Sequence, residues 1–259
     1  MRIIPFTANR LLITDLLTRA KEYHCSITAV FEYDVTELLE GIEAARAAGR
    51  EVGLVAVLVK ATAMVMEKHP RMNHHLFRRW GRWLEVEFDH INCTLIVARD
   101  GGPNGEQVLF PIRVDDANQK TVEEIHAWIR WHKQTPLEEV PQFQALQNVK
   151  KMNWFALKWF NYKARSDPEF HQKYFGTYGL SSMVRRGWGG VSGSGVSNAA
   201  SGFVPATIRA LPRVVDGEIA IRQVMTLGLV ADHYLLDGVD IDGGMTTLRE
   251  YLETTTLLD

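Results

Sequence analysis

MTLGLVADHYLLDG, at residues 225–238, joins an apolar run to a histidine, an aspartate and a glycine. The run at 225–231 predicts a buried strand, and the Asp-Gly pair at its far end predicts a turn. His233 stands where the strand gives way to the turn, so its backbone is held while its ring stays reachable. Imidazole has an ordinary pKa of about 6.5, which suits proton transfer near neutral pH. The same pattern is also typical of a structural histidine, so by itself it leaves both interpretations open.

Periodicity on either side of this stretch predicts further strands and helices in irregular order. Thr36 is an expected helix N-cap, and Thr121 with Glu124 forms an expected capping box. The expected strands are 27–35, 83–88, 92–98, 107–114 and 177–183, with two apolar runs in 218–231. The expected helices are 9–20, 36–48, 52–69, 121–130 and 242–253, and residues 131–175 are helical in places. Since the two kinds of element mix without regular alternation, we expect an α/β two-layer sandwich with a mixed β-sheet.

Composition narrows the class of protein. The 259 residues are 46% hydrophobic and 23% charged, which is compatible with a single domain over residues 1–259. A formal net charge of -2 argues against a nucleic-acid partner. No segment approaches the ~18 apolar residues of a membrane span, and the start lacks a signal peptide, so we expect no membrane partner and a cytoplasmic protein. Neither Cys25 and Cys93 nor the adjacent His74 and His75 complete a metal site, so no metal is expected.

Several short motifs, in order along nearly the whole chain, resemble one enzyme family. They are IP at 4–5 with Arg10, DVT at 34–36, LVKA at 58–61, PRMN at 70–73, VLFPIR at 108–113, DDA at 115–117, KTVEEI at 120–125, GTYGLSS at 176–182, VDGE at 215–218 and LL at 257–258. Together with the His-x-x-x-Asp-Gly pattern at 233–238, they resemble the catalytic domain of the dihydrolipoyl acyltransferases. These proteins are the core subunits of 2-oxo acid dehydrogenase complexes and are related to chloramphenicol acetyltransferase.

The resemblance implies a chloramphenicol acetyltransferase-like fold and direct acyl transfer between thiols, with coenzyme A as co-substrate. His233 would be the general base that takes the proton from the acceptor thiol. Ser181 would donate its hydroxyl to the oxyanion, and Ser182 is the alternative if the register differs by one residue. Asp237 would support the turn through an ion pair, with Arg10 as the candidate cation.

The resemblance also implies partners. Relatives form homotrimers whose active site lies between subunits, so His233 and Ser181 would come from different chains. The apolar tail at 257–258 is compatible with assembly of trimers into a larger cage. The sequence opens on the catalytic domain, with no lipoyl group and no subunit-binding domain. We therefore expect acyl-CoA as one substrate and a thiol on a separate lipoyl or acyl-carrier protein as the other.

Some features depart from the family pattern and keep other functions open. Tyr234 stands where relatives usually carry arginine. The aromatic-rich insertion at about 131–164 either lines an acyl or carrier pocket or, as is more typical, packs one helix face onto the body or a neighbouring subunit. Its aromatic residues include Trp154, Phe155, Trp159, Phe160 and Tyr162. The basic cluster of Arg78, Arg79 and Arg82 is either a solvated face or a contact for coenzyme A phosphates. The alternative functions are a catalytically silent trimeric scaffold and a small-molecule O-acetyltransferase.

Overall fold

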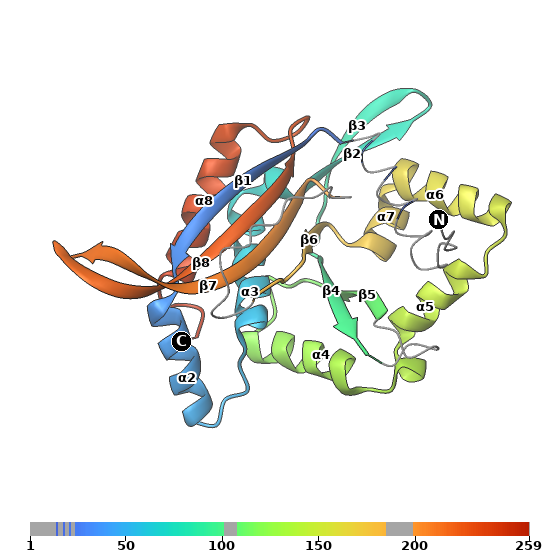
Figure 1. The fold of residues 1–259 in the computed structure, drawn as a ribbon. Helices are drawn as coiled ribbons and strands as arrows, with labels where there is room; N and C mark the ends of the chain where they lie inside the picture. Colours follow the sequence, from blue (N-terminus) through green and yellow to red (C-terminus); the bar gives the residue numbers. More distant parts are fainter. Residues whose placement is uncertain are drawn as a thin grey trace, which may run out of the picture.

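The computed structural model describes residues 24–100, 108–184 and 199–258, together with Thr14, Thr18 and Lys21. Within these residues one six-stranded sheet has the order β1-β8-β7-β6-β4-β5 (Figure 1). The strands pair antiparallel except that β6 runs parallel to both β4 and β7, so the sheet is mixed. Their bounds are β1 (Ser26–Asp34), β4 (Cys93–Arg99), β5 (Val108–Val114), β6 (Tyr178–Leu180), β7 (Ser201–Val215) and β8 (Glu218–Asp232).

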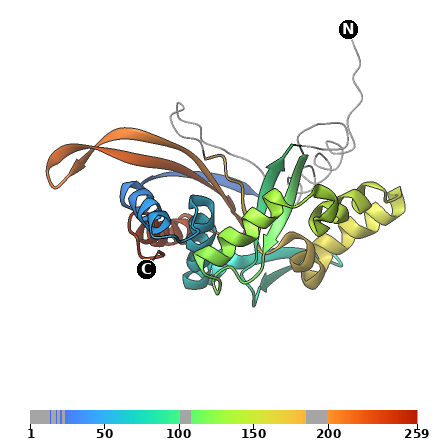
Figure 2. The same ribbon diagram turned by 90° about the horizontal axis from the view of Figure 1, so that it is seen from below.

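Helices α2 (Thr36–Ala47), α3 (Leu54–Lys68) and α8 (Gly238–Leu252) lie on one side of β1, β7 and β8 (Figure 2). The apolar residues of α3 are buried almost all round, because this helix packs against α8 and α4 (Val122–Gln134) beneath the sheet. On the sheet, Tyr33 donates a hydrogen bond from its hydroxyl to the α8 carbonyl of Met245 (3.2 Å). The predicted α/β class, with helices packed on a mixed sheet, is confirmed.

Three further helices, α5 (Pro141–Lys150), α6 (Trp154–Ser166) and α7 (Pro168–Phe175), occupy the end of the molecule opposite the β7–β8 hairpin (Figures 1 and 2). They account for most of the segment expected to be helical in places. Short 3-10 turns at Pro70–Asn73 and Leu137–Glu139 complete the described helical elements. No helix in the described part of the chain is long and apolar enough to cross a membrane.

Two hairpins escaped the sequence prediction. Strand β7 contains Pro205 and Pro212, which weaken a strand pattern, and its pairing with β8 shifts register between Pro205 and Ile208. The two apolar runs expected in 218–231 are one continuous strand, β8. The β7–β8 turn uses Asp216 and Gly217, both with positive φ (50° and 85°), which favours a tight hairpin.

The second missed hairpin pairs β2 (His74–Arg79) with β3 (Arg82–Glu87). Only β3 was expected from the sequence. The polar His-His and Arg-Arg pairs of β2 mask the alternation of apolar and polar residues in that strand. Burial nevertheless alternates along β2, where His75 and Phe77 point inward. Trp80 and Gly81 form the turn, both with positive φ (52° and 76°).

Most local signals were read correctly, and two were not. The capping box is confirmed: the Thr121 hydroxyl accepts from the Glu124 backbone N–H (3.2 Å), and the Glu124 carboxylate accepts from the Thr121 N–H (2.8 Å). Thr36 as the cap of α2 is wrong, because its hydroxyl donates to Asp34 Oδ1 (2.6 Å) and Val35 is the N-cap. Helix α8 begins four residues before the predicted 242. Apart from Thr14, Thr18 and Asp100, the helix at 9–20 and the turn at 100–105 lie outside the described residues, as does most of the Gly/Ser loop at 187–202.

Candidate active site

The turn after β8 presents His233 from a firmly held backbone. The His233 N–H donates to the carbonyl of Cys25, just before β1 (2.8 Å). Asp232 is buried, and its Oδ1 accepts from the N–H groups of Cys25 (3.1 Å) and Tyr234 (3.2 Å). Its other oxygen, Oδ2, lies 2.6 Å from His24 Nδ1. The carboxylate of Asp232 therefore ties the start of β1 to the end of β8 and sets the path of the turn.

The ring of His233 has a defined orientation although its side chain is 47% exposed. Its Nδ1 lies 2.9 Å from the carbonyl oxygen of Leu236. A carbonyl oxygen only accepts hydrogen bonds, so Nδ1 must carry the proton, and Nε2 keeps its lone pair in the neutral ring. The geometry thus leaves Nε2 able to act as a base.

Asp237 is the N-cap of α8 and has a 76% exposed side chain. Its N–H donates to the carboxylate of Asp240 three residues on (3.0 Å), and its Oδ1 lies 3.9 Å from His233 Nδ1. Arg10, its expected partner, lies outside the described residues. The cation that the structure does place at this turn is Arg71, which donates to the Leu235 carbonyl (2.7 Å) and pairs with Asp240 (3.2 Å). Sequence reasoning quoted Arg71 within a motif but assigned it no role.

Ser181 lies just beyond β6, where its N–H donates to the Phe203 carbonyl of β7 (2.9 Å). Leu180 before it is buried and Ser181 is exposed, so the serine faces away from the helices. Leu180 pairs with Phe203, whereas Ala231, two residues before His233, pairs with Ser201. His233 and Ser181 are thus two strand spacings across and about five residues along the sheet, on the order of 15–20 Å apart. A single chain does not bring them together.

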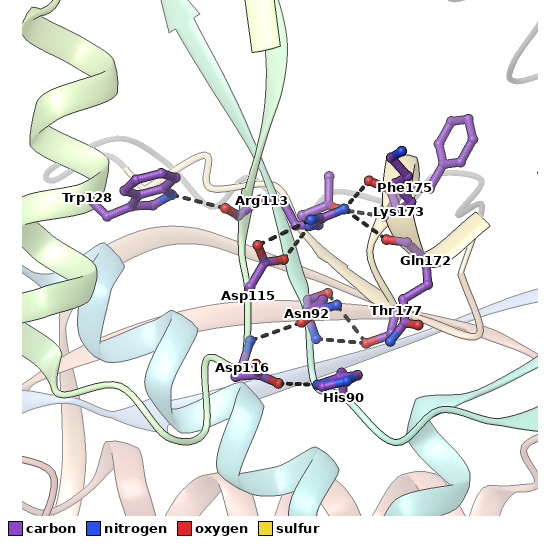
Figure 3. A network of polar contacts seen from close by, with 11 residues as sticks. His90, Asn92, Arg113, Asp115, Asp116, Trp128, Gln172, Lys173, Phe175 and Thr177 are labelled. Carbon is purple, nitrogen blue, oxygen red and sulfur yellow. Dashed lines mark hydrogen bonds and ion pairs between the residues drawn. The ribbon is translucent and has the colours of Figure 1, made fainter. Parts of the chain in front are cut away.

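A polar network holds the start of β6 in place (Figure 3). The Asn92 N–H donates to the Thr177 hydroxyl (3.0 Å), the Thr177 N–H donates to the Asn92 carbonyl (2.9 Å), and Asn92 Oδ1 accepts from the Asp116 N–H (2.9 Å). Arg113 extends the network by pairing with Asp115 and donating to the α7 carbonyls of Gln172 and Lys173. Three separate segments of the chain therefore determine where Ser181 lies.

A row of histidines with little-exposed side chains runs from the end of β8 to α7. The ring of His24, paired with Asp232, lies 5.3 Å from that of His75, which lies 4.3 Å from that of His171 on α7. Burial lowers the pKa of His171 to about 4. Burial, followed by the nearby His171 and His24, holds the pKa of His75 well below its ordinary value. The sequence offered no signal for this row, since its members are far apart in the chain.

The structure also shows the surroundings of the basic cluster and of Cys93, and whether the described side chains form a metal site. The basic cluster lies on the β2–β3 hairpin, with Arg78 over the Trp83 ring (5.6 Å) and Trp83 6.1 Å from Tyr234 in the His233 turn. Burial raises the pKa of the Cys93 thiol to about 12, so this thiol stays protonated at neutral pH. The described residues contain no group of three or more His, Cys, Asp or Glu side chains placed to hold a metal ion.

A family model described as the catalytic domain of 2-oxoacid dehydrogenases acyltransferase matches residues 1–147 and 204–258. The chain belongs to this acyltransferase family. The match leaves out the segment between 147 and 204, which carries α6, α7 and Ser181. No curated protein sequence matches the chain.

Solved acyltransferases of this family have a similar fold. A probable dihydrolipoamide acetyltransferase from Listeria monocytogenes 4b F2365 is 20% identical, with a TM-score of 0.70 over 98% of this chain and 94% of that one. The Azotobacter vinelandii dihydrolipoamide acetyltransferase is 18% identical, with a TM-score of 0.71 over 100% and 94%. That structure was solved to investigate a serine, a histidine and an asparagine in its catalytic mechanism. A catalytic core of the 2-oxoacid dehydrogenase complex from Thermoplasma acidophilum is 20% identical (TM-score 0.67, 98% of both chains).

Proposed function

We propose that this acyltransferase moves an acyl group directly between coenzyme A and a carrier thiol, with His233 as general base. The observation that carries the proposal is the hydrogen bond from His233 Nδ1 to the Leu236 carbonyl. It holds the ring in the tautomer whose exposed nitrogen is basic. The acceptor is a dihydrolipoyl group or another carrier thiol, on a separate lipoyl or acyl-carrier protein.

The reaction balances with this single base. Nε2 of His233 takes the proton of the acceptor thiol, and the thiolate sulfur bonds to the carbonyl carbon of the acyl thioester. The tetrahedral intermediate then breaks its bond to the sulfur of coenzyme A. The imidazolium returns the proton to that leaving thiolate, so the ring ends as it began. General-base assistance of this kind contributes roughly 10²–10⁴-fold.

Ser181 is the proposed donor to the oxyanion of the intermediate. In the Azotobacter relative, the investigated serine precedes the histidine by 52 residues and the asparagine follows the histidine by four. Ser181 likewise precedes His233 by 52 residues, and Asp237 follows it by four. The matched spacing supports Ser181 over Ser182. It also supports a positioning role for Asp237, whose contribution is to the turn rather than to the reacting atoms.

We further propose that the complete site forms between subunits of a homotrimer. The separation of His233 and Ser181 within one chain, on the order of 15–20 Å, is too great for both to reach one tetrahedral intermediate. A serine from a neighbouring copy removes this difficulty. One solved relative, 18% identical with a TM-score of 0.69, is the cubic core of a pyruvate dehydrogenase complex, which supports assembly of trimers into a cage.

The phosphates of coenzyme A would bind to the basic cluster. Arg78 lies over the ring of Trp83, which contacts Tyr234, so the guanidinium of Arg78 is near the His233 turn. Arg79 and Arg82 lie on the same hairpin. Guanidinium groups bind phosphates through paired hydrogen bonds, which suits the nucleotide of coenzyme A.

The test is a transfer assay with a panel of acyl-CoA donors. Dihydrolipoamide and a pantetheine thiol serve as acceptors, and thioester exchange is followed by mass spectrometry on protein of measured oligomeric state. We expect transfer by the trimer and none by a dissociated monomer. Absence of turnover across the panel by an intact trimer would overturn the proposal and favour the silent scaffold. Transfer to hydroxyl acceptors alone would favour a small-molecule O-acetyltransferase.

A further inference from the structure

Helix α6 carries an outward face that mixes aromatic and basic side chains. Trp154, Phe155 and Trp159 are 58%, 76% and 58% exposed, and Tyr162 is exposed as well. Lys158 lies among them, with its ammonium 3.9 Å from the centre of the Trp154 ring. At about 100° per residue these five positions fall on one arc of roughly 140°. These side chains therefore do not pack fully onto the body of their own chain, and packing onto a neighbouring subunit stays a prediction.

The opposite side of α6 accounts for the attachment of the helix to the protein. Phe160 packs against Phe170 and Tyr174 of α7, with ring centres 5.1 and 5.4 Å apart, and Asn161 is buried. The helix is held mainly by this inner face, with Trp159 at the border of the outer face also near the Phe170 ring (6.0 Å), and it lies at the periphery of the molecule (Figures 1 and 2). The outer face is free to contact something else.

Charge indicates what the outer face meets. Residues 140–166 contain five basic residues and no acidic one, although the whole chain has a formal net charge of -2. Lys151, at the C-cap of α5, is exposed beside the start of α6. A second copy of this same face would bring like charges together, which disfavours a two-fold contact through it, so a neighbour in the proposed trimer would have to meet it with a different face. Tryptophan, tyrosine and phenylalanine between lysines are instead typical of helices that lie in the headgroup layer of a membrane.

We propose that the outer face of α6 docks the protein on an anionic lipid surface. The aromatic rings of Trp154, Phe155 and Trp159 enter the headgroup region, and the ammonium groups of Lys151 and Lys158 bind lipid phosphates. This proposal departs from the expectation of no membrane partner, which considered only spanning segments, because a peripheral contact needs no spanning helix. It does not use the candidate catalytic residues, and its test is independent of acyl transfer.

The experiment is co-sedimentation of the full chain with phosphatidylcholine vesicles, with and without phosphatidylglycerol. We expect binding only to the vesicles that contain phosphatidylglycerol, weakening as salt is raised. The double variant Lys151→Gln/Lys158→Gln should bind on the order of twentyfold more weakly, at about fivefold for each cation removed. The variant Trp154→Ala/Phe155→Ala should lose binding by at least tenfold while its circular dichroism and oligomeric state stay unchanged.

Matched controls come from the β2–β3 hairpin, which also exposes arginine and tryptophan. Arg78→Gln/Arg82→Gln removes the same charge, and Trp80→Ala removes a tryptophan that is 85% exposed. Both controls should sediment with the vesicles as the wild type does. Equal losses in the control and α6 variants would overturn the proposal, since they would mean unspecific attraction. Loss of the oligomer in the α6 variants would overturn it as well. So would binding of single-stranded RNA by the wild type that the α6 variants lose while they still sediment with the vesicles.

Discussion

The ends of β8 and β6 carry the two candidate catalytic side chains, and they are held in different ways. At the end of β8, the ring of His233 is oriented by the Leu236 carbonyl three residues on, while its backbone is held by Cys25 just before β1. At the end of β6, the position of Ser181 depends on contacts between Asn92 and Thr177 across the chain. A contact between residues close in the chain can therefore orient the ring of a base, whereas the position of an oxyanion donor depends on contacts between distant segments. Variants at each end, and in the histidine row that runs from the end of β8 to α7, can test this difference.

The largest effect is expected from His233→Ala. Transfer should fall by about 10²–10⁴-fold, because the base is lost while the exposed ring contributes little to folding. The measurement is kcat for transfer, together with the urea midpoint. His126→Ala on α4 is the control, since it removes a histidine remote from the turn. A similar loss of activity in both variants would mean that His233 is not the base.

Ser181→Ala is expected to lower kcat by about 10²–10³-fold, the typical cost of one oxyanion donor. Ser182→Ala is the matched control and should retain nearly full activity. If Ser182→Ala loses activity and Ser181→Ala keeps it, Ser182 is the oxyanion donor. Mixing Ser181→Ala with His233→Ala subunits should restore part of the activity, because some sites in mixed trimers then contain both groups. Recovery in the absence of subunit exchange would contradict a site shared between chains.

Acid should destabilise the packing of α7 around the buried ring of His171. The folded-state pKa of His171 is about 4 and its unfolded value is about 6.5, so the unfolded chain binds more protons between these limits. The contribution of the neutral His171 ring to the free energy of unfolding is therefore fully present above about pH 6.5. It is lost as the pH falls toward about 4. This loss amounts to about 3 kcal/mol. Urea unfolding near pH 7 and near pH 4.5 should therefore differ by less in His171→Gln than in the wild type.

His90→Gln is the control for this prediction, because the hydrogen bond to Asp116 raises the pKa of the exposed His90 instead of lowering it. It should leave the acid destabilisation in place. An unchanged pH dependence in His171→Gln would show that other groups control acid stability.

The smallest effect is expected from Gly176→Ala, at the start of β6. Gly176 has φ 69° and ψ −162°, and an added Cβ would lie 2.6 Å from Thr94 Oγ1 and 2.7 Å from the Asn92 carbonyl oxygen. We expect a loss of about 2–3 kcal/mol in unfolding free energy and a parallel loss of activity. Gly217→Ala, with φ +85° and no atom within 4 Å of the added Cβ, should cost only about 1 kcal/mol. Equal costs would mean that close packing at Gly176 does not matter.

Much of the fold was predictable because its signals are local. The apolar residues of α3 at helical spacing, the alternation in β1 and the Thr121 capping box each depend on residues that are adjacent in the chain. Strands β2 and β7 were missed because paired polar residues in one, and prolines in the other, conceal the alternation. Their positions are decided by partners on β3 and β8.

The sequence by itself determined the candidate base and the family, because His233 lies in a contiguous motif and the other motifs follow in order. It also placed Ser181 in a strand expected over 177–183, whereas β6 spans only Tyr178–Leu180 and Ser181 lies just beyond it. Only the tertiary structure decided that Arg71 supports the turn, that His24, His75 and His171 form one row, and that His233 and Ser181 are far apart in one chain. The physical reason is that these relations depend on strand order and register, which bring together residues from 51 (His24 and His75) to 164 (Arg71 and Leu235) positions apart.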